Sequence, residues 1–201
     1  MKIGVIIDNL TIGGVQKIAF NEVKTFLKLG IDSSLIVMDS VVNVNQEIID
    51  YFDKVPIITL ADILPSPLRR RIRIPPFDFL KLQDFIIPYY SKCIRVLSDY
   101  DIIIAHNPIA CFLALKNKRE FKIPYIAYIH DPMIYIARKV YAKSYGSLIS
   151  LLEPIIRQVE KTVLSKADTV VLQSHYHSSL LKETYGLAPK VIYPGYDTWT
   201  Y

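Results

Sequence analysis

Residues 1–16 read Met-Lys-Ile-Gly-Val-Ile-Ile-Asp-Asn-Leu-Thr-Ile-Gly-Gly-Val-Gln. Within them, Lys2–Asp8 is an apolar run rich in β-branched residues, which predicts a strand buried on both faces. Asn9–Gly14 supplies turn residues, and Val15–Leu29 carries apolar residues at helical spacing. In open parallel sheets, ligands lie at the carboxyl ends of strands, where free helix N–H groups can face an anion. We therefore expect Gly13-Gly14 at the rim of any active cleft.

The same alternation of strand and helix continues along the chain. Further strands are expected at Ile31–Met38, Val55–Leu60, Asp101–Ala105, Pro124–Ile129, Asp168–Leu172 and Lys190–Tyr193. Helices are expected at Gln46–Phe52, at Phe77–Leu97 with a bend near Pro88, at Ile109–Lys116, at Ile134–Ser165 in two pieces parted near Ser144–Ser147, and from the N-cap Ser174 to Gly186. This order predicts an α/β fold with a doubly wound, mostly parallel Rossmann-like sheet of about seven strands.

The length of 201 residues suits one α/β domain, or at most two small ones. We expect this domain to span residues 1–193. Pro194-Gly195 is a breaker, so residues 194–201 are expected to begin an interdomain linker, with a second, C-terminal domain absent from this sequence.

The composition narrows the class of protein. Apolar residues make up 51% of the chain, yet Asp8 cuts short the first apolar run, so no signal peptide is expected. Cys93 and Cys111 are too few for a disulfide framework and lack zinc-type spacing. These features predict a cytoplasmic, reduced protein. The net charge of +5 suits anionic ligands or an anionic membrane surface and does not by itself indicate nucleic acid.

Asp62–Pro76 interrupts the regular pattern, because its prolines disfavour a core element, and we expect a surface excursion there. It carries four arginines next to apolar side chains, namely Arg69, Arg70, Arg71 and Arg73. Such a mixture suits docking on anionic lipid headgroups. A solvated basic loop is the alternative.

Polar residues follow two of the expected strands. His106 and Asn107 come after one, and His130 and Asp131 come after the next, so these side chains are candidates to line one cleft. A neutral imidazole at His130 can hydrogen-bond a polar ligand, whereas a satisfied structural histidine is the plainer interpretation. For His106 and Asn107 an ordinary turn is the alternative, and Asp131 either orients the His130 ring or begins the next turn. No metal site is expected.

Several motifs in chain order resemble the N-terminal half of a GT-B glycosyltransferase of the family-4 type. Gly13-Gly14-Val15-Gln16 resembles the glycine-rich loop of that family. The stretches 100–108 and 123–131 resemble its fourth strand and its fifth strand, which ends in a histidine. The clearest match runs from Ser165-Lys166-Ala167-Asp168 through Tyr185-Gly186 to Pro194-Gly195-Tyr196-Asp197. The matches extend over nearly the whole chain.

The resemblance implies an enzyme that moves a sugar, of the hexosyltransferase type, from a nucleotide-sugar donor to a saccharide or lipid-linked acceptor. Retention of configuration and independence of metals and other cofactors are implied as well. Gly13 and Gly14 would face the donor, and Gln16, together with His106, Asn107 and Asp131, would face the acceptor. His130 would be the catalytic candidate, which orients the acceptor through hydrogen bonds to sugar hydroxyls. For the two glycines an ordinary turn is the alternative, and for Gln16 a plain helix position.

In that family a second domain holds most of the donor and supplies two glutamates with seven residues between them. This sequence stops where that domain would start, so we expect little or no transferase activity from the 201 residues without that domain or a separate chain. Glu153 and Glu160 are the nearest imitation, but only six residues lie between them and they fall in the wrong half. Their positions two turns apart on one helix face predict solvated surface.

Two other functions remain open. Asp39, near the end of the second expected strand, is where a ribose-binding acid of a dinucleotide-dependent oxidoreductase would lie, although adjacent glycines do not match G-x-G-x-x-G. A non-catalytic binding or assembly module with the same fold is the other alternative. Localisation is expected to be cytoplasmic, with peripheral attachment at the inner membrane face.

Overall fold

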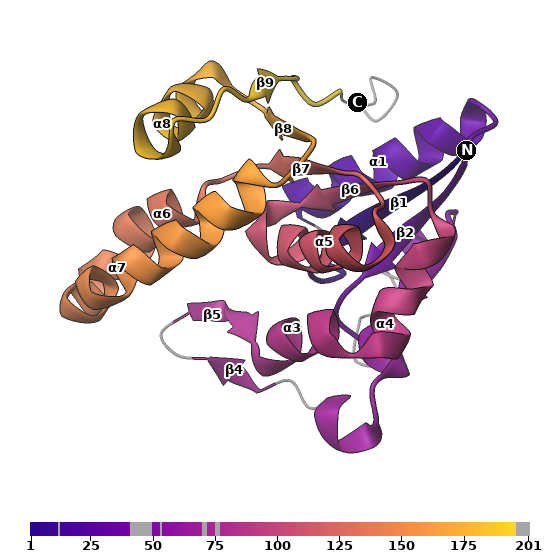
Figure 1. Ribbon diagram of the computed structural model, residues 1–201, viewed down its shortest axis with the longest axis horizontal. Coiled ribbons are helices and arrows are strands. Elements are labelled where there is room, and N and C mark those ends of the chain that lie inside the picture. Colours follow the sequence, from indigo (N-terminus) through magenta and orange to yellow (C-terminus); the bar gives the residue numbers. More distant parts are fainter. Residues whose placement is uncertain (12, 41–49, 53, 70–71, 75–76, 196–201) are drawn as a thin grey trace.

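The computed structural model describes residues 1–11, 13–40, 50–52, 54–69, 72–74 and 77–195 (Figure 1). Over these residues the strands of the main sheet form one seven-stranded sheet in which every neighbouring pair is parallel. These strands are β1 (Lys2–Ile7), β2 (Asp32–Val37), β3 (Ile57–Thr59), β6 (Ile102–His106), β7 (Tyr125–Ile129), β8 (Thr169–Leu172) and β9 (Lys190–Val191). The predicted α/β Rossmann-like fold is confirmed.

The order of the strands across the sheet locates its ligand-binding edge. The order is β3-β2-β1-β6-β7-β8-β9, so the chain winds one way from β1 through β2 and the other way from β6 onward. The direction of winding therefore reverses between β1 and β6. Ligands of such sheets bind in the crevice outside the carboxyl ends of the strands at this switch point.

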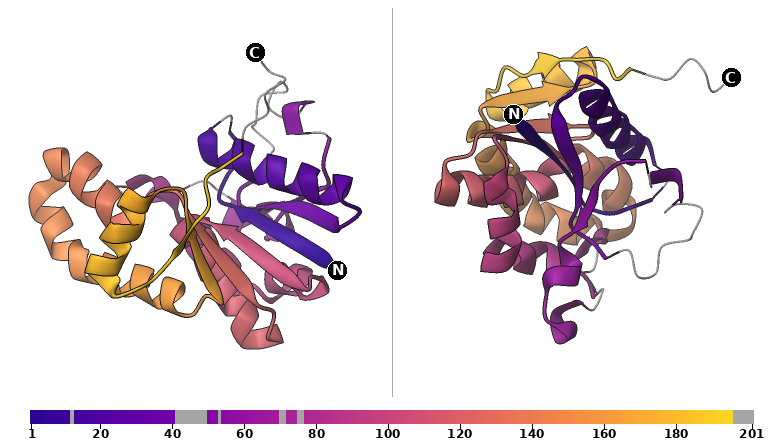
Figure 2. Two further views of the ribbon diagram at one scale, coloured as in Figure 1. Left: turned by 90° about the horizontal axis from the view of Figure 1, so that it is seen from above. Right: turned by 90° about the vertical axis from the view of Figure 1, so that its right-hand side faces the viewer.

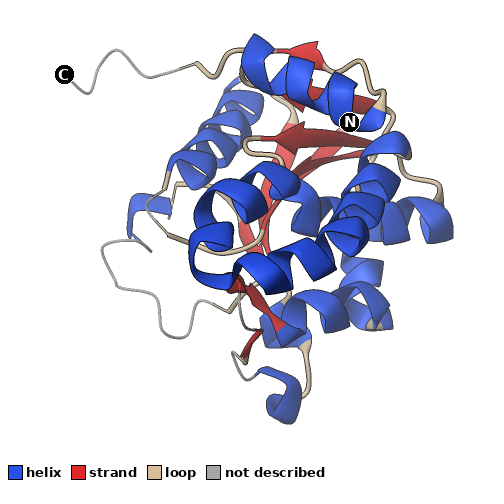
Figure 3. Cartoon of the chain, turned by 90° about the vertical axis from the view of Figure 1, so that its left-hand side faces the viewer, coloured by secondary structure: helices blue, strands red, loops and turns tan. Residues whose placement is uncertain are grey.

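Helices cover both faces of the sheet because successive strand residues point to opposite sides. Val5 and Ile7 of β1 pack with Phe20 of α1, whereas Ile6 between them belongs to the core on the other face. Figure 2 shows α1 lying along one side of the sheet, and Figure 3 shows other helices standing in front of the strands. The α-helices are α1 (Gly14–Lys28), α3 (Leu82–Ile86), α4 (Ser91–Val96), α5 (Asn107–Phe121), α6 (Met133–Ile136), α7 (Ala142–Ser165) and α8 (His175–Tyr185).

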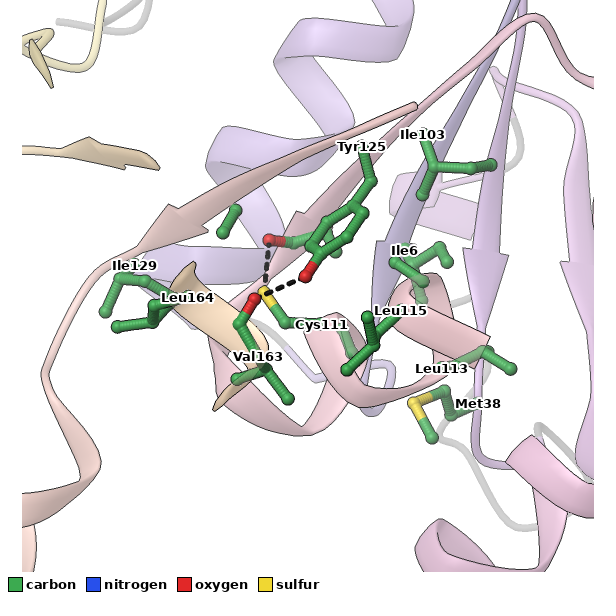
Figure 4. Packing of buried hydrophobic residues seen from close by; sticks show 14 of the residues in the cluster. Ile6, Met38, Ile103, Cys111, Leu113, Leu115, Tyr125, Ile129, Val163 and Leu164 are labelled. Carbon is green, nitrogen blue, oxygen red and sulfur yellow. Dashed lines mark hydrogen bonds between the residues drawn. The ribbon is translucent and has the colours of Figure 1, made fainter. Parts of the chain in front are cut away.

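The larger core lies between the sheet and α5 and α7 (Figure 4). Tyr125 of β7 is fully buried there, and its hydroxyl donates a hydrogen bond to the carbonyl of Val163 in α7. Cys111 of α5 is buried beside it, and its thiol donates to the carbonyl of Ala105 at 3.5 Å. Cys111 and Cys93 are both free and buried, as expected of a chain without a disulfide framework. Burial raises the pKa of Cys93 to about 11 and raises that of Cys111 as well.

The segment before β6 differs from its prediction. Phe77–Lys81 is not helical but forms β5, which pairs antiparallel with β4 (Arg73–Ile74). The alternation of Phe77-Asp78-Phe79 is a period-two pattern, and pairing with β4 satisfies its backbone. The rest is helical in short pieces, with a 3₁₀ turn at Ile87–Tyr89 that contains Pro88 and parts α3 from α4. The bend expected near Pro88 is therefore confirmed.

The surface excursion expected at Asp62–Pro76 is confirmed at residues 65–69 but not at Leu64, which is fully buried in the larger core. Residues 65–69 are exposed, and the turns there are the 3₁₀ helices η1 (Ala61–Ile63) and η2 (Ser66–Arg69). The helix expected at Gln46–Phe52 lies mostly outside the described residues, although Asp50–Phe52 is helical.

The long helical region after β7 is divided as expected. A π-helix, η5 (Ala137–Tyr141), joins α6 to α7, and Tyr145 breaks the helical backbone with φ −136° and ψ 35°. Together α6, η5 and α7 project to one side of the sheet (Figure 1). Their outer surface carries apolar side chains, since Leu151 is 73% and Ile155 60% exposed.

The prediction of a solvated surface at Glu160 is wrong. Its carboxylate is fully buried and accepts hydrogen bonds from the backbone N–H groups of Met133 at 2.6 Å and Ile134 at 3.2 Å, and from the Tyr185 hydroxyl at 2.6 Å. It thus satisfies the first N–H groups of α6, which otherwise lack intrahelical partners. The Glu153 side chain, on the same helix, is 24% exposed and instead pairs with Arg138 at 2.6 Å.

Candidate functional site

The glycine turn lies where α1 begins after β1. Gly13 is the N-cap of α1 with φ −118°, a backbone conformation open to any residue. Gly14 is exposed, and a Cβ added there would meet nothing within 4 Å. The fold itself therefore does not require Gly14, and its absent side chain leaves the backbone accessible to a ligand.

Gln16 closes the same loop from inside. Its side chain is buried, and its Nε2 donates to Oδ1 of Asn9 at 3.1 Å. A Cβ added at Gly13 would come within 2.5 Å of Gln16 Oε1, so the amide lies directly against that glycine. The structure thus gives Gln16 a part in holding the loop, and its contact with an acceptor stays a prediction.

His106 and His130 meet at the carboxyl ends of β6 and β7. Nδ1 of His106 lies 2.8 Å from Nε2 of His130, and Nε2 of His106 lies 2.9 Å from Oε2 of Glu22 on α1. Nδ1 of His130 is hydrogen-bonded to Nε2 of Gln173, the residue after β8. Four side chains from neighbouring elements therefore form one continuous hydrogen-bonded chain.

The burial of these rings decides what each can do. His106 is fully buried, so it faces Glu22 and His130 rather than a cleft, and we reassign it from acceptor contact to support of His130. His130 is 6% exposed, and its burial, reinforced by the adjoining His106, lowers its pKa to about 3. A ring with this pKa is uncharged at neutral pH, which agrees with the neutral imidazole expected from its position.

Asn107 and Asp131 flank the histidine pair. Asn107 begins α5 with φ +68°, a left-handed conformation that asparagine tolerates better than most residues. Its Oδ1 accepts from the backbone N–H of His130 at 3.4 Å, which links the two strand ends. Asp131 is exposed, and its Oδ1 lies 3.9 Å from Nε2 of His177. The structure therefore brings Asn107 onto His130 and leaves Asp131 facing solvent.

A second polar cluster was not foreseen from the sequence as a site. Asp39, after β2, is buried and forms an ion pair with Lys81, and Nε2 of Gln83 donates to its Oδ1 at 2.7 Å. Asp84 is 3% exposed, and burial raises its pKa to about 7. Asp8, after β1, also has its pKa raised by burial. The positions of Asp8 and Asp39 directly after buried strands were a sequence signal for this cluster.

This cluster bears on the oxidoreductase alternative. A ribose-binding acid must offer a free carboxylate to two hydroxyls. The carboxylate of Asp39 instead holds Lys81 and Gln83 inside the fold. The arrangement therefore disfavours dinucleotide binding at this position.

The arginine cluster is described only in part, because Arg70 and Arg71 lie outside the described residues. Arg69 is exposed and its Nε donates to the carbonyl of Leu64 at 2.6 Å. Arg73 is exposed on β4, next to Ile72, which is 51% exposed. Cationic and apolar groups thus lie side by side on the surface, as the membrane hypothesis needs.

A groove of about 560 Å³ lies between α1 and the residues after β9. Its walls include Glu22 of α1, Tyr128 of β7 and Pro194. The carboxylate that ends the histidine chain therefore borders an open groove on the α1 side of the sheet.

Two features are absent from the described part of the chain. No three His, Cys, Asp or Glu side chains gather there in a way that could hold a metal ion. Nor does any helix in those ranges combine the length and apolar character needed to cross a bilayer.

Comparisons with known proteins agree with the architecture. The model of the family described as Glycosyltransferase Family 4 matches residues 12–199. No curated protein sequence matches the chain.

Among solved structures, Anabaena Alr3699/HepE in complex with UDP and glucose is similar, with 14% identity and a TM-score of 0.66, over 98% of this chain and 45% of that one. Sucrose-phosphate synthase from Thermosynechococcus elongatus has 13% identity and a TM-score of 0.61, over 98% of this chain and 90% of that one. The lipopolysaccharide outer core galactosyltransferase WaaB, in its apo form, has 14% identity and a TM-score of 0.59, over 96% and 45%. The likeness shows a shared fold, and this chain spans about half the length of the first of these proteins.

Proposed function

Because the chain belongs to glycosyltransferase family 4, we propose that it is the acceptor-side part of an enzyme that transfers a sugar from a nucleotide-sugar donor to a saccharide or lipid-linked acceptor. The proposal includes a hexosyl group, retention of configuration and no requirement for a metal, all taken from the resemblance. Similar folds have been solved with UDP and with UDP-glucose, which supports a nucleotide-sugar donor.

The observation that carries the proposal is the meeting of three features at the switch point of the sheet. The exposed Gly14 follows β1, Asn107 follows β6, and His130 follows β7. Their strands are neighbours in the order β1-β6-β7, so their carboxyl ends share one edge. A ligand at this edge would meet bare backbone on one side and a neutral imidazole on the other.

These groups suit a sugar and a diphosphate. Bare N–H groups at the start of α1 attract an anion, because the first N–H groups of a helix lack intrahelical partners. A neutral imidazole exchanges hydrogen bonds with hydroxyls and adds no charge. Gly13 and Gly14 are thus proposed for the donor, and His130 with Gln16, Asn107 and Asp131 for the acceptor.

We assign the remaining donor contacts to a further domain or a separate chain, as the resemblance implies. The matched length supports this, since the chain covers 45% of the Anabaena structure. Without those contacts only the start of α1 faces the leaving nucleoside diphosphate, so the 201 residues alone are expected to show little or no turnover.

Calorimetric titration tests the proposal on the purified chain. UDP-glucose, GDP-mannose and NAD are compared, with the variant Gly14→Glu as a matched control whose side chain fills the proposed donor position. The proposal expects weak binding of a nucleotide sugar that this variant loses, and no binding of NAD. Binding of NAD in preference to UDP-glucose and GDP-mannose would instead support the oxidoreductase alternative.

Nucleotide release separates the enzyme from a non-catalytic module. It is measured with the protein encoded by the complete source reading frame and with the 201 residues. Turnover by the complete protein but not by the 201 residues fits the proposal. Binding of the nucleotide sugar without turnover by either protein fits an assembly module. Robust turnover by the 201 residues would refute the need for a second domain.

We also propose peripheral attachment to an anionic membrane at the cytoplasmic side. Arg69 and Arg73 are exposed beside Leu68 and Ile72, and α7 presents exposed apolar residues such as Leu151. Each cation near an anionic surface contributes on the order of 1 kcal/mol.

Liposome co-sedimentation tests the attachment. Vesicles with and without anionic lipid are incubated with the wild type, with a variant in which all four arginines of residues 69–73 are glutamine, and with Leu151→Asp. Binding that depends on anionic lipid and falls in the variants supports the proposal. Equal binding of all three proteins, or none by the wild type, removes it.

A further inference from the structure

The hydrogen-bonded chain through the two histidines has a definite direction. Its members, in order, are Gln173, His130, His106 and Glu22. Each contact joins one donor to one acceptor, so the protonation of each ring nitrogen follows from its neighbour. The two ends of the chain are not titrating imidazoles, and they therefore fix the direction.

At one end, an ionised glutamate only accepts hydrogen bonds. Glu22 Oε2 lies 2.9 Å from His106 Nε2, so this nitrogen must carry the proton. In a neutral ring His106 Nδ1 is then an acceptor. His130 Nε2 lies 2.8 Å from His106 Nδ1 and must therefore carry the proton of this hydrogen bond, as the donor to His106 Nδ1.

At the other end, the amide nitrogen of Gln173 faces His130 Nδ1. An amide N–H₂ only donates, which requires an unprotonated Nδ1. Both ends thus give the same result for His130. A charged His106 would reverse its contact with His130 and force a proton onto Nδ1, against the Gln173 amide.

We propose that Glu22 and His106 are positioning residues that hold His130 as the Nε2–H tautomer, so that its Nδ1 is kept as a hydrogen-bond acceptor for a sugar hydroxyl. The hydroxyl takes the place of Gln173, which is only partly buried and lies at the carboxyl end of β8. This assignment of a ligand rests on the proposed function, whereas the tautomer does not.

The surroundings favour the same state. His106 is fully buried, whereas the Glu22 side chain is 22% exposed. Among the four hydrogen-bonded side chains, the one carboxylate therefore lies at an end that reaches solvent. The ring of Tyr128 adjoins both imidazoles, with centroids 5.1 Å from His106 and 4.9 Å from His130. The site therefore recognises a hydroxyl by accepting its proton in a hydrogen bond, and it does so without charge.

Nitrogen-15 NMR measures the tautomer directly in the folded chain. Two-bond ¹H–¹⁵N spectra distinguish Nδ1–H, Nε2–H and doubly protonated rings. The chain has four histidines, and the substitutions His175→Gln and His177→Gln identify the two signals outside the pair. At neutral pH, His106 and His130 are both expected as the Nε2–H tautomer.

Two substitutions of Glu22 test what sets the tautomer. Glu22→Gln retains an oxygen that can accept from His106, so both tautomers should be unchanged. Glu22→Leu removes the acceptor, and both rings should lose their single tautomer. Tautomers that are the same in the leucine variant as in the wild type would overturn the proposal.

Gln173→Leu supplies a test that does not touch α1. Without the Gln173 amide, the His130 Nδ1 signal should shift but Nδ1 should stay unprotonated, because the direction is set from Glu22. A proton on Nδ1 in this variant, or on Nδ1 in the wild type, would overturn the proposal. The spectra need no substrate. The tautomer proposal can therefore fail while the titration and turnover experiments support sugar transfer, and the reverse can also occur.

Discussion

Asp84 is expected to weaken the fold at neutral and alkaline pH, and Asp84→Asn to strengthen it. The side chain is 3% exposed, and its Oδ2 accepts from the backbone N–H of Lys81 at 2.8 Å. Its Oδ1 is buried without a hydrogen-bond partner among the described residues. Asparagine keeps an oxygen for the Lys81 N–H and removes the charge.

The magnitude follows from the pKa of this carboxyl, which burial raises from 3.8 to about 7. Below pH 3.8 the group is protonated in both the folded and unfolded states and costs nothing. Between the two values only the unfolded state ionises, so the free energy of unfolding falls by about 1.4 kcal/mol per pH unit. The cost is therefore about 0.5 kcal/mol at pH 4 and levels off at about 4 kcal/mol above pH 7.

Urea unfolding followed by circular dichroism measures this difference between wild type and Asp84→Asn at a series of pH values. The variant should gain stability as pH rises, with most of the gain appearing between pH 4 and pH 7. Asp99→Asn is the matched control, because it makes the same substitution at an exposed position.

A pH-independent difference for Asp84→Asn would refute the reasoning, as would a loss of stability at pH 8. Either result would mean that the carboxyl is ionised in the folded protein and paired there with Lys81. The control separates this outcome from a general effect of replacing aspartate.

Substitutions at three further positions have expected outcomes. Glu160→Ala should lower the free energy of unfolding by about 3 kcal/mol or more, because three buried donors lose their acceptor, and Glu160→Gln by clearly less; urea unfolding compares them. Gly14→Ala should leave stability equal or raise it by up to about 1 kcal/mol, since its Cβ meets nothing, while nucleotide-sugar affinity in the titration falls about tenfold or more. Gly186→Ala should cost about 1 kcal/mol in thermal unfolding because Gly186 has φ +70° at the end of α8, and an unchanged melting temperature would contradict this.

The sheet was predictable because its strands are buried on both faces. Lys2–Asp8 and Ile31–Met38 read as continuous apolar runs, and the structure places β1 and β2 within one residue of those limits. Ser174 and Gly186 likewise signalled the ends of α8 through local geometry, since the Ser174 hydroxyl accepts from the N–H of His177 at 3.2 Å. Local signals suffice where burial or capping depends on neighbours in sequence.

The errors arise where partners are distant in sequence. Glu160 looked like a surface residue on its own helix, and only the packing of α6 against it explains its burial. The contact between Glu22 and His106 joins residues 84 positions apart, so no periodicity could indicate it. For Phe77–Lys81, apolar spacing fitted a helix, but the partner strand at Arg73–Ile74 decided for a hairpin.

The burial of both cysteines makes the protein suitable for site-directed labelling. Cys93 and Cys111 are the only thiols in the chain, both are buried, and both have a raised pKa, so few thiolates are available to react with a maleimide at neutral pH. A single cysteine introduced on the exposed outer surface of α7 should therefore react selectively without removal of the native pair. A fluorophore at that position would report directly how far the projecting helices lie from a lipid surface.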